Sequence, residues 1–322
     1  MRVSGSLVNC VVVFAALAAA PALAGEGGRS NKVSFYFAAH QDDWQLFMNP
    51  SAFEDVAGGA AKTVFVHVTA GDAGSGTGSR GRQHPYYLAR DNGADNAVRF
   101  MVDANTSPAR EAVSQMAFNG HAIYRVSYRN TVRYFLRVPD GNVPGTGYAS
   151  TGWQSLKRFA DGKIDTLTAV DNSAVYHGWS DLVATMQAIM TFERGSAALV
   201  QINVADPDAR INPDDHSDHL MVSKLAVDAA KDLGCVRRVY YVDYASSKLP
   251  ENLNARQRDM ESSVFAVTLA GVLAFDHGTA WRHYDESYVG RNYFRAVEPA
   301  AACNAVRTEV ASARTVKLPT GP

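Results

Sequence analysis

Two long apolar runs in the first part of the chain carry the clearest structural signal. The runs "KVSFYFAAH" (32–40) and "TVFVHVTAG" (63–71) do not alternate with polar residues, which is typical of strands buried on both faces. The stretch between them, about 43–57, has a helical pattern. Strand, helix and strand at this spacing predict a βαβ unit, and therefore a parallel sheet with right-handed crossovers.

The later pattern extends this unit into one α/β domain over 32–300. Further helices are predicted at 85–103, 179–193, 216–234 and 251–274, and further strands at 197–208 and 237–244. Gly234 is the expected C-cap of the third of these helices. The segment 120–175 instead alternates and is rich in aromatic residues, so we interpret it as an inserted antiparallel β segment. The predicted architecture is a Rossmann-like three-layer fold with a mostly parallel sheet.

The two ends of the chain differ from this domain. Residues 1–24 combine Arg2, an apolar stretch "VVVFAALAAA" and the small residues "ALA" at 22–24, which is typical of a cleaved signal peptide. An uncleaved anchor is the alternative, although the stretch is short for a spanning helix. Residues 25–31 are expected to form a flexible leader, and 301–322 a C-terminal tail. We therefore expect a periplasmic or secreted protein with no stable membrane insertion.

Composition narrows the classes of partner. The 322 residues are 47% hydrophobic and 20% charged, with a formal net charge of −1. Because there is no basic excess, nucleic acid is not an expected partner. After signal cleavage two cysteines remain, Cys235 and Cys303. In an oxidising compartment they can form a disulfide, or they can be two buried thiols, and the sequence leaves both possibilities open.

Side chains that bind metals cluster after two of the predicted strands. His40, Asp42 and Asp43 follow the first strand, and "DDHSDHL" places His216, Asp218 and His219 after the strand near 197–203. Ligands of an open parallel sheet bind beyond the carboxyl ends of its strands, so both clusters are expected at one edge. Taken singly, each cluster has a simpler interpretation, such as an aspartate capping a helix.

Together, the two clusters favour a metal-dependent amide hydrolase. Two imidazoles and one carboxylate would hold a divalent ion such as Zn²⁺ and leave a position open for water. The ion lowers the pKa of that water, and the remaining carboxylate can take its proton. The remaining histidine can donate a hydrogen bond to a developing oxyanion or protonate the leaving amine.

Four segments also resemble the PIG-L (LmbE-like) de-N-acetylase family. "AAHQDDWQLF" is similar to the family's AHPDDE motif, and "HSDHL" to its HPDH motif. "VFVHVTAGDAGSG" and "YYLARDNGA" resemble its second strand and its arginine-containing helix. The resemblance implies one Zn²⁺ held by His40, Asp43 and His219, and an N-acetylated sugar or glycoconjugate as substrate.

The resemblance also implies the roles of the remaining site residues. Asp42 would be the general base, His216 the oxyanion donor or general acid, and Asp218 a residue that orients His216 or a ligand. Arg90 would contact the substrate.

The chain departs from the family pattern at Gln41, Trp44 and Gly93. Trp44 can offer a stacking face to a sugar, or it can be a packed core residue. Asp72, in the glycine-rich loop 71–85, can bind substrate or simply belong to the loop. His67, within a strand, is expected to be a core histidine. The departures keep two alternatives open: a metal hydrolase of another small amide or ester, and a non-catalytic carbohydrate-binding relative.

Overall fold

The computed structural model describes residues 31–104, 106–299 and 303, and in this part of the chain eight strands form one sheet in the order β10-β9-β8-β1-β2-β5-β4-β3. The predicted signal peptide, most of the leader and nearly all of the tail lie outside the described residues. The strands of this sheet are β1 (Lys32–Ala38), β2 (Ala61–Thr69), β3 (Ala112–Phe118), β4 (His121–Tyr128), β5 (Thr131–Val138), β8 (Leu199–Ala205), β9 (Val236–Tyr241) and β10 (Phe294–Val297).

The five central strands, β9 to β5 in that order, are mutually parallel, while β10, β4 and β3 add antiparallel edges. The antiparallel pair predicted in the 120–175 segment is present as β4 and β5. Strand β5 also pairs in parallel with β2 and so joins the central sheet, which the alternating pattern of this segment does not predict. A separate two-stranded ribbon, β6 (Thr166–Thr168) with β7 (Val175–His177), follows it.

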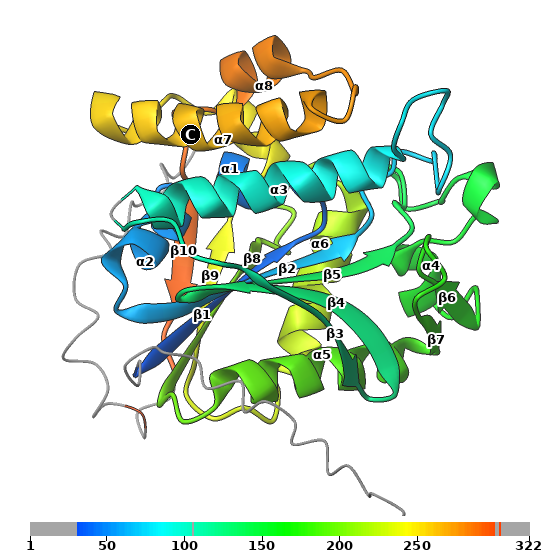
Figure 1. Ribbon diagram of the computed structural model, residues 1–322. Helices are drawn as coiled ribbons and strands as arrows, with labels where there is room; N and C mark the ends of the chain where they lie inside the picture. Colours follow the sequence, from blue (N-terminus) through cyan, green and yellow to red (C-terminus); the bar gives the residue numbers. More distant parts are fainter. Residues whose placement is uncertain (1–30, 105, 300–302, 304–322) are drawn as a thin grey trace, which may run out of the picture.

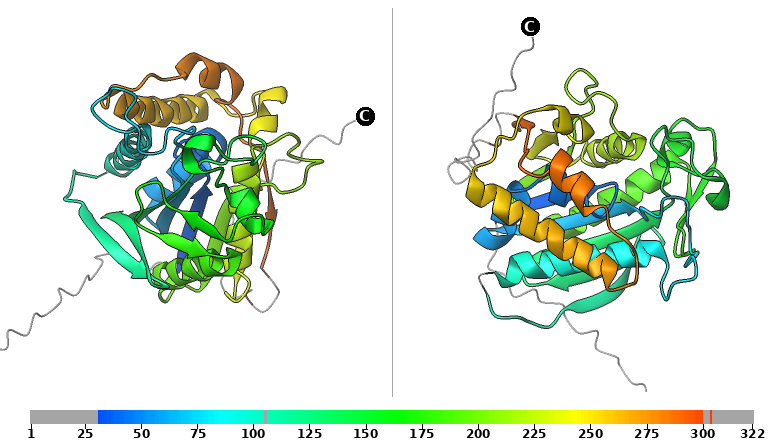
Figure 2. Two further views of the ribbon diagram at one scale, coloured as in Figure 1. Left: turned by 90° about the vertical axis from the view of Figure 1, so that its right-hand side faces the viewer. Right: turned by 90° about the horizontal axis from the view of Figure 1, so that it is seen from above.

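Helices cover both faces of the sheet, which gives the expected three layers (Figures 1 and 2). One face packs against α4 (Leu156–Ala160), α5 (Trp179–Arg194) and α6 (Ser217–Ala229). The other packs against α1 (Asp43–Phe47), α2 (Ser51–Gly58), α3 (Tyr86–Asp103) and α7 (Ala255–Leu273), with α8 (Trp281–Ser287) outermost beside α7. Two short 3₁₀ helices are η1 (Ala149–Thr151) and η2 (Tyr244–Lys248).

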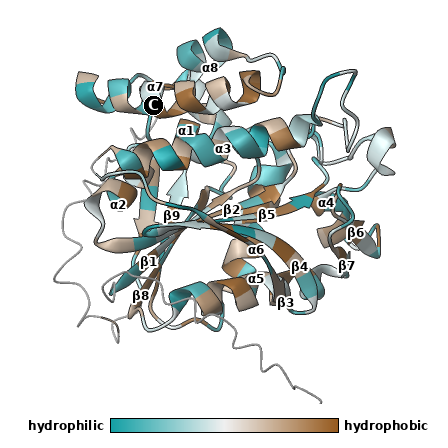
Figure 3. Cartoon of the chain, viewed as in Figure 1, coloured by the Kyte–Doolittle hydropathy of each residue, from teal (hydrophilic) through white to brown (hydrophobic). Residues whose placement is uncertain are grey.

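Strand β1 shows why its sequence does not alternate. Val33, Phe35 and Phe37 belong to one apolar cluster, whereas Tyr36 and Ala38 belong to the cluster on the opposite face. Both faces of the strand are therefore covered, and apolar residues run along the central strands (Figure 3). No helix in the described ranges is both long and apolar enough to cross a bilayer.

Two local predictions need correction, and one open alternative is decided. The helical stretch 43–57 is two helices, α1 and α2, separated at Asn49–Pro50. Helix α6 ends at Ala229, so Gly234 is not its C-cap. The left-handed residue that follows it is Cys235, with φ of 58°. Cys235 forms a disulfide with Cys303, with a Cα–Cα distance of 5.5 Å.

Candidate metal centre

The predicted clusters meet at the carboxyl edge of the sheet. Strand β1 lies between β2 and β8, where the order of the parallel strands reverses direction, and such a switch point is the usual binding position in an open α/β sheet. His40 and Asp43 follow β1, and His219 lies in the first turn of α6 after β8. Residues 179 apart in sequence are thereby brought into contact.

His40, Asp43 and His219 form a compact triad of buried side chains. His40 Nδ1 lies 3.4 Å from Asp43 Oδ1, and His219 Nε2 lies 3.3 Å from both Asp43 Oδ1 and His40 Nδ1. Zinc takes nitrogen and oxygen ligands at about 2.0–2.1 Å in a tetrahedral arrangement, which separates neighbouring ligand atoms by about 3.3 Å. The three ligand atoms therefore have the mutual spacing that one tetrahedral zinc ion requires.

A backbone hydrogen bond orients the Asp43 carboxylate within the triad. Asp43 Oδ2 accepts a hydrogen bond of 2.7 Å from the backbone N–H of His40, which leaves Oδ1 to face the two imidazoles. Asp43 is also the first residue of α1, where the helix dipole favours a carboxylate. The tight turn after β1 thus fixes which oxygen is presented to an ion.

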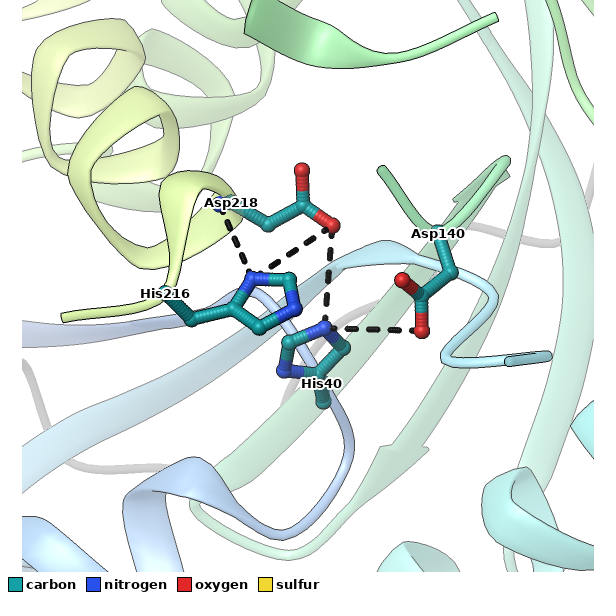
Figure 4. A group of neighbouring side chains, drawn as sticks. All are labelled: His40, Asp140, His216 and Asp218. Atoms are coloured by element: carbon teal, nitrogen blue, oxygen red, sulfur yellow. Dashed lines mark hydrogen bonds and ion pairs between the residues drawn. The ribbon is translucent and has the colours of Figure 1, made fainter. Parts of the chain in front are cut away.

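Further carboxylates lie behind the two triad histidines. His219 Nδ1 is 2.9 Å from Asp215 Oδ1 and 3.2 Å from Asp243 Oδ2. His40 Nε2 faces Asp218 Oδ2 at 3.6 Å and Asp140 Oδ2 at 3.8 Å (Figure 4). A carboxylate behind a histidine orients the ring and leaves its other nitrogen for a metal. Asp218 therefore lies where a residue that orients His40 belongs.

Buried carboxylates around His40 and His219 favour positive charge in the site. Burial alone would lower the pKa of His40, but Asp43, Asp218 and Asp140 outweigh it and raise the pKa to about 10. Burial likewise opposes, but Asp215 and Asp43 raise, the pKa of His219 well above its ordinary value. Buried carboxylates thus outnumber the groups that neutralise them, and a divalent cation would supply the missing charge.

His216 lies beside the triad with a defined tautomer. Its ring centroid is 4.7 Å from that of His40, and its Nδ1 accepts a hydrogen bond of 3.1 Å from the backbone N–H of Asp218 (Figure 4). Burial, with His40 and His219 nearby, lowers the pKa of His216 to about 2. A neutral ring that accepts at Nδ1 carries its proton on Nε2, so His216 is equipped as a hydrogen-bond donor.

Asp42 forms an ion pair with Arg90 at the mouth of the site. The Arg90 guanidinium contacts Asp42 Oδ1 and donates at 3.1 Å to the carbonyl of Gly71. Burial opposes, but Asp42 raises, the pKa of Arg90 above its ordinary value. The predicted general base and the predicted substrate-binding arginine are therefore direct partners.

A pocket of about 120 Å³ opens over His40 and Asp43 of the triad. Asp42, His216 and Arg90 contribute to its walls together with Tyr244 and Tyr284. Both aspartates of the β1 turn thus reach one cavity, Asp43 among the triad and Asp42 beside Arg90.

Two candidate substrate contacts, Trp44 and Asp72, are buried in the structure. Trp44 is 0% exposed: its ring packs 4.5 Å from that of Phe65 and its Nε1–H donates to His67 Nε2 at 3.1 Å. It therefore has no free face for a sugar, and His67 is the core histidine expected. Asp72 is also 0% exposed, and its two carboxylate oxygens accept hydrogen bonds from the backbone N–H groups of Asp140 and Gly76. Its role is to tie the glycine-rich loop to the end of β5.

The other two departures from the family pattern have structural reasons. Gln41 Nε2 donates to Asp91 Oδ1 at 2.9 Å and to the carbonyl of Ala70 at 3.1 Å, which fixes the β1 turn against α3. Gly93 lies where α7 crosses α3, and a Cβ there would be 2.6 Å from the Thr268 carbonyl oxygen. The close crossing of these helices requires glycine.

Five residues near the site escaped prediction from the sequence. Asp140, Asp215 and Asp243 lie behind the histidines, and Tyr244 and Tyr284 line the pocket. Asp140 and Asp243 each follow closely on a parallel strand, β5 and β9, so the rule that identified His40 also applies to them. Tyr284 has no such signal, because its position depends on how α8 packs.

Comparison with known proteins gives weak matches. No protein-family model matches the sequence, and a search of curated proteins finds no significant match. Among solved structures, N,N'-diacetylchitobiose deacetylase from Pyrococcus horikoshii is 13% identical with a TM-score of 0.46, covering 84% of this chain and 85% of that one. Teicoplanin deacetylase Orf2, in a zinc-inhibited form, is 13% identical with a TM-score of 0.41, covering 79% and 90%. Both are LmbE/PIG-L-type de-N-acetylases.

A third similar structure has another activity. GalB, the 4-carboxy-2-hydroxymuconate hydratase from Pseudomonas putida KT2440, is 14% identical with a TM-score of 0.37, covering 79% of this chain and 82% of its own. Likenesses this distant transfer neither substrate nor mechanism to this chain. The functional argument therefore rests on the side chains of the site.

Proposed function

We propose that this protein is a zinc-dependent hydrolase that removes an N-acetyl group from an amino sugar or glycoconjugate. The observation that carries the proposal is the mutual spacing of 3.3–3.4 Å among His40 Nδ1, Asp43 Oδ1 and His219 Nε2. The choice of acetyl as the group removed, and of a sugar as its carrier, rests on the resemblance of the two motifs to the PIG-L (LmbE-like) family.

His40, Asp43 and His219 would hold the zinc. When bound, zinc supplies Lewis-acid chemistry, polarising the amide carbonyl and making a water easier to deprotonate. Asp42 lies at the pocket and takes the proton of the attacking water, while Arg90 keeps its carboxylate in position. His216 donates from Nε2 to the oxygen on which negative charge develops. Asp215 and Asp243 hold the ring of His219, and Asp218 and Asp140 that of His40.

We also propose that the protein works in the periplasm or outside the cell. The signal-peptide pattern at 1–24 supports this location. The disulfide between Cys235 and Cys303 supports it independently, because such bonds persist in oxidising compartments.

Metal content and acetate release test the proposal together. The purified protein is expected to hold one zinc per chain and to release acetate from N-acetylated sugars, with release stopped by a chelator. Asp43→Ala and His219→Ala should each lose the metal and reduce turnover by at least about a thousandfold, since the Lewis acid is lost. Asp214→Ala is the matched control, because this aspartate is largely exposed in the loop before α6. Full zinc occupancy in both triad variants would refute the ligand assignment.

A further inference from the structure

A second cavity, of about 180 Å³, adjoins the metal pocket. The two share three wall residues, Asp42, Arg90 and Tyr284. A molecule with its amide at the triad therefore has an adjacent space on the far side of the Asp42–Arg90 pair. We call this second cavity the side pocket.

Helices rather than strand ends build the side pocket. Helix α7 contributes Thr268, Leu269 and Val272, the first turn of α3 contributes Tyr86, and α8 contributes Tyr284. Residues 278–280, which connect α7 to α8, complete the wall. Figure 1 shows α7 and α8 lying over α3 at this end of the molecule.

The side pocket is preformed. Gly271 lets α7 approach α3 closely, since a Cβ there would lie 2.7 Å from Gly93 Cα. The connection after α7 is anchored by His277, which is buried and donates from Nε2 to the carbonyl of His84 at 2.8 Å. Its walls are thus held by helix packing and by a buried hydrogen bond before any ligand arrives.

The chemistry of its walls selects an apolar group. Among the lining residues only Asp42 and Arg90 are charged, and they neutralise each other. Leu269, Val272, Ala280 and the rings of Tyr86 and Tyr284 present carbon atoms, and Gln41, Thr268 and Thr279 are the uncharged polar side chains besides the two tyrosine hydroxyls. An anionic or highly hydroxylated group would lose hydrogen bonds to water that these walls do not replace.

We propose that the side pocket binds an apolar arm of the substrate while its amide lies at the triad. The proposal rests on the proposed function and deepens it, because the substrate would be more than a free N-acetylated sugar. The arm is either an aryl group linked to the sugar, which keeps acetyl as the group removed, or an acyl chain longer than acetyl, which would replace acetyl as the group removed by the same amide hydrolysis. In both cases the side pocket would bind a short apolar group close to the scissile amide.

Hydrolysis of two substrate series distinguishes the two sources. The first is glucosamine carrying acetyl, butanoyl or hexanoyl on nitrogen, and the second is the phenyl glycoside of N-acetylglucosamine. The wild type should favour one series over N-acetylglucosamine by roughly tenfold or more in kcat/KM. Ala280→Trp places an indole at an exposed wall position and should abolish that preference. Ala274→Trp is the matched control, as Ala274 is exposed near the end of α7 but does not line the cavity.

Binding of the products tests the side pocket without turnover. The product of the preferred series, hexanoate or phenyl glucosaminide, should bind the intact enzyme with a Kd that Ala280→Trp raises roughly tenfold and Ala274→Trp leaves unchanged. If neither compound binds the wild type more tightly than acetate and glucosamine, or if both variants behave alike, the side-pocket proposal is overturned. Binding that depends on Ala280 without any amide hydrolysis would preserve the side pocket and refute the deacetylase alone.

Discussion

The metal pocket and the side pocket share a wall but are built on different principles. In the metal pocket His40 and Asp43 lie in the turn directly after β1, and His216 and His219 lie at the start of α6, the helix that follows β8. The parallel pairing of β1 with β8 therefore brings the two groups together. In the side pocket the key side chains come from α3, α7 and α8, whose positions depend on helix packing. The first arrangement can be predicted from runs of sequence, whereas the second requires knowledge of how separate helices cross.

This difference separates chemistry from selectivity. A change at a strand end should remove turnover without moving a helix. A change at the α3–α7 crossing should reduce stability and selectivity while leaving the metal ligands in place. The variants below test each half of that statement, beginning with the largest expected effect.

Asp42→Asn should remove turnover from the metal pocket while the triad keeps its metal. Asparagine cannot take a proton from water, so kcat should fall by about 10²–10⁴-fold. Zinc content should stay at the wild-type level, because Asp42 is outside the triad. Steady-state kinetics and metal analysis on the same preparation measure both quantities, with Asp214→Asn as the control. Wild-type turnover in Asp42→Asn would remove this residue as the base.

Gly93→Ala should disturb the crossing of α3 and α7, which builds the side pocket. The new Cβ would meet the Thr268 carbonyl at 2.6 Å, and overpacking of this kind costs about 1–3 kcal/mol. Denaturant unfolding should show that loss, while zinc content is retained. Gly58→Ala in α2 is the control, since nothing lies within 4 Å of its Cβ position. It should be neutral or stabilise by up to about 1 kcal/mol. Equal stability of the two variants would contradict the close crossing.

His67 lies in the core beneath the β1 turn, where it accepts a hydrogen bond from Trp44. Burial lowers its pKa to about 3, from an ordinary value near 6.5. Between pH 6.5 and pH 3, His67 is therefore protonated in the unfolded chain and neutral in the folded chain. Stability is fully present above pH 6.5 and falls as the pH drops toward 3, by up to about 1.4 kcal/mol per pH unit.

His67→Gln should flatten this acid dependence. Glutamine can still accept from Trp44 but does not titrate, so the stability difference between pH 7.5 and pH 5 should shrink relative to wild type. Unfolding in urea at the two pH values measures it. His177→Gln, at an exposed position, should leave the dependence unchanged. An identical slope in wild type and His67→Gln would show that His67 takes up its proton without unfolding.

The sequence predicted the meeting of His40, Asp43 and His219 because one rule governs strand ends in a parallel sheet. It missed Asp140 because β5 alternates like an antiparallel strand, and its parallel pairing with β2 depends on residues far away in sequence. The sequence leaves two interpretations of Trp44 open because spacing does not show which way a side chain points at a turn. Its ring points into the core, toward Phe65 and His67.

Hydrogen bonds between side chains and the backbone could not be predicted from the sequence either. The carboxylate of Asp72 accepts hydrogen bonds from two backbone N–H groups, and no pattern of residue types reveals such partners. The disulfide remained one of two possibilities because the distance between Cys235 and Cys303 depends on where β9 begins and where β10 ends. In each case the missing information was spatial.

The neighbouring strands β1 and β8 have a consequence for how the enzyme would be loaded. The proposed ligands on either side of this pair are 179 residues apart, and contacts so distant in sequence require a long loop to close. A growing or unfolded chain thus has no triad, and the proposed zinc ion could bind only after β8 has docked beside β1. If the chain is exported before it folds, the ion would be drawn from the supply of the compartment where folding occurs.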